Sequence, residues 1–226
     1  MNIQRSDERG SANYGWLRTQ YSFSFANYYN PEKVGFGKLL VLNEDHVAGK
    51  KGFGMHHHDN MEIVTVVLSG AIEHKDSEGN HGVVKAGEVQ RISAGKGILH
   101  SEFNPSDKEL HLLQIWINTK KKDIIPSYEQ KKIALKKDSF TVLVSNAVKS
   151  GLHINQDAAI LRGKIAKGKK AAYSLKQKKL YVFIIDGEIS VKDAILKTGD
   201  SAEIDDMKKI EIITRKNSDI LLIDIP

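Results

Sequence analysis

Cysteine is missing from this sequence of 226 residues. Its absence excludes disulfide bonds, thiolate metal sites and thiol nucleophiles together, so any bound metal must use nitrogen and oxygen ligands. Long apolar runs are missing too. No stretch approaches the roughly 20 residues that span a bilayer, and the first residues contain no apolar signal-peptide core. We therefore expect a cytoplasmic protein without a membrane partner.

The net charge of +6 is not concentrated in one block. The lysines form short clusters, Asp and Glu alternate with them, and aromatic residues are not regularly interleaved. This pattern favours a solvated lysine-rich surface over a nucleic-acid interface. The clusters lie at residues 120–122, 131–132, 167–170, 176–179 and 208–209.

What the sequence does contain is a series of short β-branched or apolar runs, each bounded by Gly, Asn, Asp or Pro. Such runs at regular intervals predict an all-β barrel or sandwich. The strands are expected over residues 35–43, 62–68, 110–117, 140–145, 158–164, 180–185, 210–214 and 220–225. Between the two sets of strands, a lysine-rich stretch predicts one short helix over residues 127–132.

A weak internal repeat suggests two similar halves. VTVVLSG ends at Gly70 and is followed by a turn at Gly87-Glu88, while LYVFIIDG ends at Gly187 and is followed by a turn at Gly199-Asp200. The intervals differ, so two unrelated hairpins would explain the pattern equally well. With a chain long enough for two cores, we expect domains over residues 1–125 and 126–226.

Histidine is concentrated in the first half, where eight of the nine lie between His46 and His111. Side chains at i and i+2 share a strand face, so His56 and His58 are expected to point together while His57 points away. About 40 residues later, His100 and Glu102 repeat this spacing. Two neighbouring strands that each supply such a pair would give a first-row divalent metal three imidazoles and one carboxylate.

Three longer segments carry a family resemblance: GFGMHHHDNMEI, LSGAIEHKDSEGN and GEVQRISAGKGILHSEFN. With the N-terminal run RGSANYGWLRTQYSFSFANYYNPEKVGFG, the LLQIWI strand and the closing ILLIDIP, the sequence resembles the pirin family of bicupins over essentially its whole length. It is similar especially to bacterial pirin-like proteins credited with quercetin 2,3-dioxygenase activity. The resemblance implies two antiparallel cupin β-barrels packed face to face, with metal only in the first.

Position by position, the resemblance gives His56, His58, His100 and Glu102 as metal ligands. The family often has proline between the first two ligands, and here His57 stands there as an alternative ligand. The general cupin pattern instead places the ligand glutamate at Glu62, whose sequence parity also turns it inward. The pirin resemblance favours Glu102.

The repeat predicts which chemistry the second half lacks. Aligning the glycine turns places Tyr173 and Leu175 where His56 and His58 stand, and Ile212 where His100 stands. None of these three side chains binds a metal in the required way. We therefore expect a C-terminal domain without metal.

The resemblance implies an oxidoreductase that opens a flavonol ring with O2. In such a site the carboxylate of Glu102, once it loosens from the metal, is the natural acceptor for the proton of the substrate hydroxyl and would act as general base. The expected cofactor is one divalent transition metal ion: iron, with Ni, Cu, Co, Mn or Zn as alternatives. The alternative function is a non-enzymatic regulatory protein that uses its metal as a redox sensor and acts through a protein partner. We expect a monomer.

Overall fold

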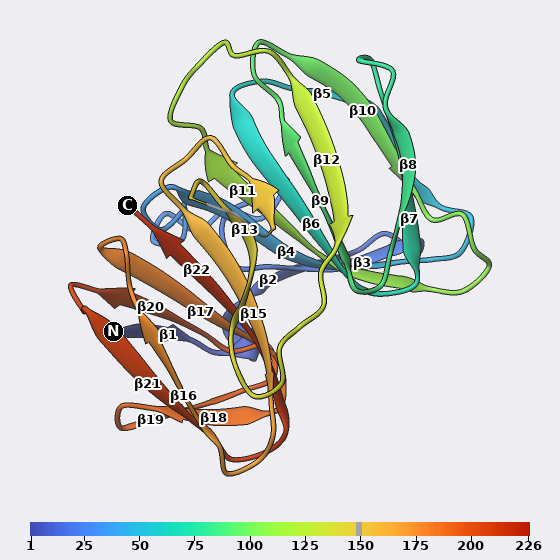
Figure 1. Cartoon of the computed structure of the whole chain (residues 1–226). Coiled ribbons are helices and arrows are strands. Elements are labelled where there is room, and N and C mark those ends of the chain that lie inside the picture. Colours follow the sequence, from blue (N-terminus) through green and yellow to red (C-terminus); the bar gives the residue numbers. More distant parts are fainter. Residues whose placement is uncertain (148–150) are drawn as a thin grey trace. The chain divides into compact units, whose positions relative to one another are not determined.

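Strands make up nearly all of the regular structure in this chain (Figure 1). A computed structural model describes residues 1–147 and 151–226, and within them the one helix is a 3-10 turn, η1 (Ser6–Glu8). The prediction of an all-β fold is confirmed. Two units are formed: an N-terminal unit of Gly10–Ile133 and Leu152–Gln156, and a C-terminal unit of Met1–Arg9, Ala134–Gly151 and Asp157–Pro226.

Two antiparallel sheets form the N-terminal unit. The larger has seven strands in the order β12-β9-β6-β11-β4-β3-β2, and the smaller has four in the order β5-β10-β7-β8. The strands of this unit are β2 (Gly10–Asn13), β3 (Leu17–Tyr21), β4 (Leu39–Val47), β5 (Gly52–His58), β6 (Met61–Ser69), β7 (Ala71–Asp76), β8 (His81–Lys85), β9 (Glu88–Ser93), β10 (Ile98–Phe103), β11 (Leu110–Asn118), β12 (Ser127–Lys132) and the short β14 (Leu152–His153).

The C-terminal unit is built in the same way, from sheets of order β1-β20-β17-β22-β15-β13 and β16-β21-β18-β19. Its strands are β1 (Asn2–Gln4), β13 (Thr141–Ser145), β15 (Ala159–Ile165), β16 (Lys170–Ser174), β17 (Lys179–Asp186), β18 (Glu188–Val191), β19 (Ala194–Lys197), β20 (Ser201–Asp205), β21 (Lys209–Thr214) and β22 (Ser218–Ile225).

The strand orders show the internal repeat directly. The series β9-β6-β11-β4-β3 corresponds to β20-β17-β22-β15-β13, and β5-β10-β7-β8 corresponds to β16-β21-β18-β19. The turns at Gly70 and Gly187 both have positive φ, 81° and 102°, a conformation that favours glycine. Among the described residues no strand pairing joins the two sheets of a unit, so each unit is a cupin-like sandwich. The expected pair of antiparallel cupin domains is confirmed, and of the two forms that the strand pattern allowed, barrel or sandwich, each unit takes the sandwich.

Three segments differ from the sequence-based expectations. Residues 127–132 form strand β12 instead of a helix, because they pair in register with β9 and become the edge strand of the larger sheet. The strand expected from residue 35 begins at Leu39, because Phe36 and Leu39 close a tight turn before it in which Gly37 has positive φ. At the N-terminus, β1 pairs with β20 of the C-terminal unit, so the units and the expected ranges 1–125 and 126–226 do not coincide.

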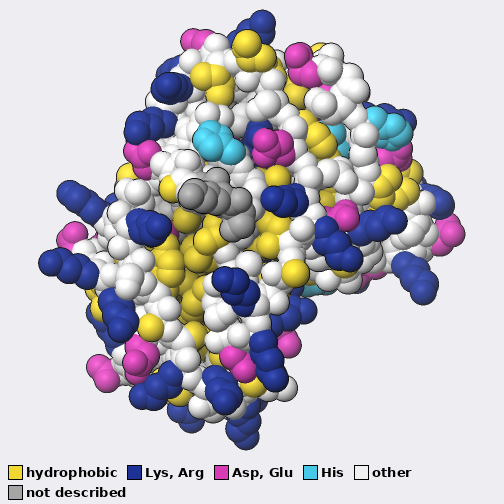
Figure 2. All heavy atoms as spheres, viewed as in Figure 1, with side chains coloured by type: hydrophobic (Ala, Val, Ile, Leu, Met, Phe, Trp, Pro, Cys, Tyr) yellow, Lys and Arg dark blue, Asp and Glu magenta, His cyan; other side chains and the backbone are white. Residues whose placement is uncertain are grey.

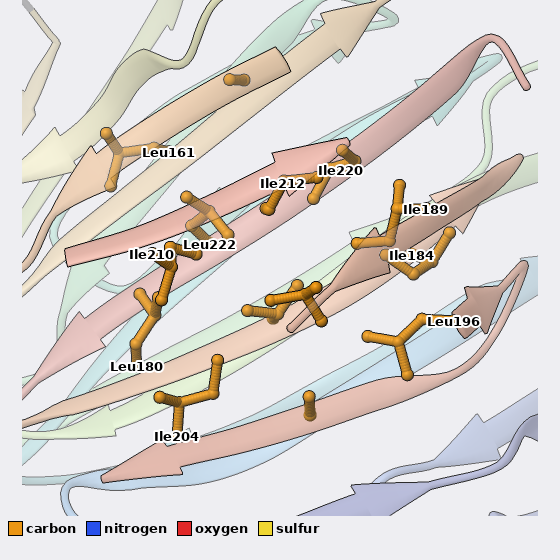
Figure 3. Packing of buried hydrophobic residues seen from close by; sticks show 14 of the residues in the cluster. Leu161, Leu180, Ile184, Ile189, Leu196, Ile204, Ile210, Ile212, Ile220 and Leu222 are labelled. Atoms are coloured by element: carbon orange, nitrogen blue, oxygen red, sulfur yellow. The ribbon is translucent and has the colours of Figure 1, made fainter. Parts of the chain in front are cut away.

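Apolar side chains fill the interior of the C-terminal unit (Figure 3). Ile212 is fully buried in this cluster, and Tyr173 and Leu175 pack against it. These are the three positions that correspond to His56, His58 and His100 in the sequence repeat. In the strand pairing, Ile212 lies opposite Ala171, whereas His100 lies opposite His56, so the sequence repeat and the register differ by two residues at this pair. Both residues of the pair in the C-terminal unit are apolar.

In the N-terminal unit, two apolar clusters are separated by polar side chains. On β6, Thr65 lies between Ile63 of one cluster and Val67 of the other, and on β11 Gln114 lies between Trp116 and Leu112. Because alternate residues of a strand share a face, these polar groups point into the sandwich. They form the surroundings of the candidate site.

The surface agrees with a dispersed positive charge. On the face drawn in Figure 2, Lys and Arg side chains are spread out and acidic side chains lie among them. Across residues 1–147 and 151–226, the structure has no helix with the length and apolar character needed to cross a membrane.

Candidate metal centre

The structure brings His56, His58 and His100 together inside the N-terminal unit. Strands β5 and β10 are antiparallel neighbours, with His100 opposite His56 and Ile98 opposite His58. The ring centroid of His56 lies 4.8 Å from that of His58 and 4.3 Å from that of His100. The centroids of His58 and His100 are 5.0 Å apart. One ring nitrogen from each of the three lies within 4.8 Å of the others. His57 points elsewhere, with a side chain that is 56% exposed.

The surroundings orient these imidazoles for binding a cation. The His56 Nδ1 donates to the Gly54 carbonyl oxygen at 2.7 Å, which leaves Nε2 as the acceptor atom. The His58 ring packs edge-on against Trp116 at 4.7 Å. His100 is 1% exposed, and neither of its ring nitrogens has a hydrogen-bond partner among the described residues. A buried imidazole with two unpaired nitrogens is costly unless something binds it, so the residues fit a metal.

Burial also sets the charge state of these rings. It lowers the pKa of His58 to about 4 and that of His100 to about 3, and the neighbouring His56 lowers both further. Both imidazoles are therefore neutral at pH 7. Neutral imidazole is the form that binds a metal ion.

Glu102 lies on β10 two residues after His100, beyond an irregularity in the β5–β10 register. Its Oε2 accepts a hydrogen bond from Gln114 Nε2 at 2.9 Å, and its Oε1 accepts one from Gln90 Nε2. Thr65 Oγ1 accepts from Gln90 and donates to Gln114, so it holds both amides in place. Burial raises the pKa of Glu102 to about 7. A nearby positive charge would favour its ionised form.

Glu102 also lies close to a residue that sequence reasoning missed. One ligand atom each from His74, His100 and Glu102 lies within 4.8 Å of the others. The His74 Nε2 is 2.9 Å from Asp76 Oδ2, both side chains are fully buried, and the His74 ring stacks on Tyr128 at 4.3 Å. The signal in the sequence was the i, i+2 pair His74 and Asp76, whose significance depends on a strand pairing that sequence alone does not give.

Glu62, the alternative carboxylate, does not join the histidines. It lies on the face of β6 opposite to Thr65, where its Oε2 accepts from Ser93 Oγ at 2.8 Å and from the Asn155 backbone N–H at 3.3 Å. The expected inward parity is wrong, because the chain reverses at Asn60 (φ 48°) and continues in the other sheet. Counting alternation from His58 through this turn therefore has no structural meaning.

A cavity of about 500 Å³ adjoins the histidines in the N-terminal unit. Its walls are mostly apolar and aromatic, and the side chains of His56, His58 and Glu102 also line it. Trp16 and Phe53 meet edge to face at 5.3 Å, as do Phe25 and Trp116. Pockets of this size and character accommodate small organic ligands.

Polar atoms without partners also face this cavity. Asn43 and Thr19 line it, both are at most 4% exposed, and neither Asn43 Oδ1 nor Thr19 Oγ1 has a hydrogen-bond partner within the described part of the chain. Buried polar atoms are normally satisfied by protein, water or ligand. These two positions therefore mark where a bound molecule would find polar contacts.

Two sandwich units of one strand order, with a histidine cluster inside the first, define a bicupin. Comparison with protein families places the chain more closely: residues 3–117 match the Pirin model, and residues 142–225 match the model of the quercetinase C-terminal cupin domain. The chain therefore belongs to the pirin family.

Similar proteins span the whole chain. It is 39% identical over 226 residues to a quercetin 2,3-dioxygenase of Escherichia coli K12, covering 99% of this chain and 98% of that protein. It is 36% identical to a pirin-like protein of Caulobacter vibrioides, covering 96% of each. The solved structure of the Escherichia coli bacterial pirin YhhW in complex with nickel(II) matches with a TM-score of 0.94 and 38% identity, over 100% of this chain and 98% of that one.

Proposed function

We propose that this pirin is a metal-dependent dioxygenase that opens the ring of a flavonol with O2. The observation that carries the proposal is a trio of imidazoles, two of them held neutral by burial, beside a buried carboxylate and an aromatic cavity. The names of the relatives and the nickel(II) in the YhhW structure support it.

In this proposal His56, His58, His100 and Glu102 hold one divalent metal ion. Three nitrogens and one carboxylate oxygen suit several first-row metals, of which iron is our expected one. The ion would supply Lewis acidity toward the substrate oxygen and access to O2 chemistry. The carboxylate also balances part of its charge inside the sandwich.

Glu102 is the proposed general base. When its carboxylate loosens from the metal, it is the acceptor for the proton of a substrate hydroxyl. The amide groups of Gln114 and Gln90 fix the orientation of its two oxygens. The proton therefore moves to a carboxylate whose position is determined before the substrate binds.

The cavity suits a flat aromatic substrate. Aromatic side chains on its walls offer faces and edges for packing against fused rings, which is the favourable geometry for aromatic pairs. Asn43 Oδ1 accepts a hydrogen bond from a substrate hydroxyl, and Thr19 Oγ1 either donates or accepts one. A polyphenol such as quercetin satisfies both requirements.

The test is a turnover measurement. Protein loaded separately with Fe, Ni, Cu, Co or Mn is mixed with quercetin in air, and the loss of flavonol absorbance is followed against anaerobic and chelator-treated controls. We expect loss that requires both metal and O2, and that His58→Ala abolishes. Oxygen-independent loss, or no loss with any of the five metals, would refute the proposal and leave the regulatory function.

A second variant tests the cavity separately from the metal. Asn43→Ala removes a hydrogen-bond acceptor from the wall and should raise KM for quercetin by roughly 10-fold, consistent with about 1.4 kcal/mol for one hydrogen bond to the substrate. Metal content should be unchanged, because Asn43 lies outside the candidate ligand set. An unchanged KM would show that the substrate does not reach this wall.

A further inference from the structure

Two histidines form a second cluster on the outer face of the larger sheet of the N-terminal unit. Along β4, Asn43 and Asp45 line the cavity, so the alternation of the strand turns Glu44 and His46 to the opposite face. His111 on β11 lies directly opposite His46 in the β4–β11 register. The pair therefore belongs to the same rigid sheet as the cavity but faces away from it.

The two imidazoles stack on each other, each with a carboxylate at one nitrogen. Their ring centroids are 4.1 Å apart and the ring planes differ by 14°. His111 Nε2 lies 3.0 Å from Glu44 Oε1, and His46 Nδ1 lies 2.9 Å from Glu109 Oε1. One ligand atom each from Glu44, His46 and His111 lies within 4.8 Å of the others.

Charge and access at this cluster both favour a cation. Glu44 and Glu109 bring two carboxylates to the two imidazoles, and Arg18 contacts the second of them, with its Nη2 2.9 Å from Glu109 Oε2. The side chains of Glu44, His111 and His46 are 12, 24 and 33% exposed, so an ion can enter while retaining water. Next to them is a hollow of about 390 Å³, lined by Glu44 and His46 among others.

We propose that Glu44, His46 and His111 bind a second divalent transition metal ion such as Zn²⁺ or Ni²⁺. Two imidazoles and a carboxylate are ligands that these ions prefer, and the strand pairing fixes the backbone positions of all three. Water would complete the coordination of the ion, because the cluster is partly exposed. The ion binds more weakly than one at the inner cluster, because its ligands are partly solvated and already hydrogen-bonded to one another.

This site differs from an ordinary surface histidine. His81 also lies beside a carboxylate, with its Nε2 2.6 Å from Glu73 Oε1, but it has no second imidazole in any cluster of ligand atoms found among the described residues. His81 is therefore the matched control. The inference does not depend on the proposed dioxygenase function, since the outer cluster and the cavity lie on opposite faces of the sheet.

The experiment is equilibrium dialysis of the full chain against rising free Zn²⁺, with bound metal counted per chain. We expect two separate binding steps in the wild type. The double variant with His46→Ala and His111→Ala should lose the weaker step, by at least about 10-fold in affinity, and keep the tighter one. The His81→Ala variant should keep both, and circular dichroism should show that all three proteins are folded.

Two outcomes would overturn the proposal. One is a wild type that binds only a single Zn²⁺ up to millimolar free metal. The other is a second step that persists unchanged in the double variant, which would place the ion elsewhere. The conservative substitution Glu44→Gln gives an independent check: it removes a ligand charge while preserving shape, and should weaken the second step without affecting the first.

Discussion

At the scale of single residues, substitution of two buried glutamates tests which ligand pattern the metal centre follows. The pirin pattern makes Glu102 the fourth ligand, and the general cupin pattern makes it Glu62. Glu102→Ala removes a charged oxygen beside His100 and should weaken metal retention by roughly 10-fold or more, and abolish flavonol turnover. Glu62→Ala should reduce metal retention and turnover less than Glu102→Ala does, because the Glu62 carboxylate contacts Ser93 and Asn155 on the other face of β6. Elemental analysis after dialysis measures both effects.

His57→Ala is the matched control in this comparison, because its exposed ring points away from the cluster. It should retain metal as the wild type does, while His56→Ala, His58→Ala and His100→Ala should each behave like Glu102→Ala. If Glu62→Ala lost its metal while Glu102→Ala kept it, the fourth ligand would be Glu62, as in the general cupin pattern.

Glu62 should also give the protein a measurable pH dependence. Burial raises its pKa above the ordinary 4.5, so the folded state keeps this proton to a higher pH than the unfolded state does. As pH rises above 4.5 the unfolded chain releases the proton first, and the wild type loses stability. Glu62→Gln cannot ionise, so its Tm relative to wild type should increase between pH 5 and pH 8.

Calorimetry or circular dichroism at the two pH values checks this sign. The same substitution at Glu78, an exposed residue, provides the baseline. A Tm difference between Glu62→Gln and wild type that is constant or shrinks with rising pH would mean that Arg91 and the hydrogen bonds outweigh burial at this carboxylate.

Sequence reasoning placed His56, His58, His100 and Glu102 as two i, i+2 pairs because strand alternation is a local property. It failed for Glu62, since alternation is interrupted wherever the chain turns into another sheet. It also missed His74, which reaches His100 only through the pairing of β7 with β10. Positions that depend on strand register cannot be read from local periodicity.

At the scale of elements, the close pairing of β5 with β10 holds the candidate ligands together. Gly52 lies opposite Phe103, and a Cβ at position 52 would overlap the backbone carbonyl oxygen of Glu102. Gly52→Ala should therefore push the two strands apart, destabilise the fold by about 1–3 kcal/mol and weaken metal retention.

Gly54 provides the control on the same strand, because a Cβ there would have no heavy atom within 4 Å. Gly54→Ala keeps the carbonyl that accepts from His56 and should change neither Tm nor metal content appreciably. If thermal melts and elemental analysis found the two alanine variants equivalent, the tight β5–β10 approach would not be what positions the histidines.

The long central strands follow from apolar runs, but β12 shows the limit of that signal. Its sequence SYEQKK is polar and mostly exposed, and it becomes a strand because the edge of β9 offers unpaired backbone groups. A tertiary contact thus decides the conformation of a segment whose own composition does not. The same limit applies to β1, which finds its partner β20 far along the chain.

At the scale of the whole molecule, one strand order is used twice with different interiors. In the N-terminal unit, polar side chains interrupt the apolar interior at Thr65, Gln90 and Gln114, and the histidine cluster adjoins them. In the C-terminal unit the corresponding interior holds one continuous apolar cluster. The hydroxyl of Tyr173, which packs against this cluster, donates a hydrogen bond to Asp224 Oδ2 at 2.7 Å. The repeat therefore preserves the architecture, and the candidate metal centre lies in the N-terminal unit.

This difference predicts how metal is distributed over the chain. Purified, dialysed protein should retain about one ion, held at the inner cluster, because the outer cluster at His46 and His111 empties on dialysis. Stripping that ion with a chelator should lower the Tm, since the buried His100 nitrogens then lack a partner and the ligand no longer stabilises the folded state.

The double variant with His46→Ala and His111→Ala tests how many metal ions the inner cluster binds. Without the outer cluster it should bind one ion at any free metal concentration up to millimolar, and His58→Ala added to it should remove that ion. Elemental analysis and thermal melts follow both changes. A second tight ion in the double variant would have to lie outside both clusters and would contradict the expected single tight site.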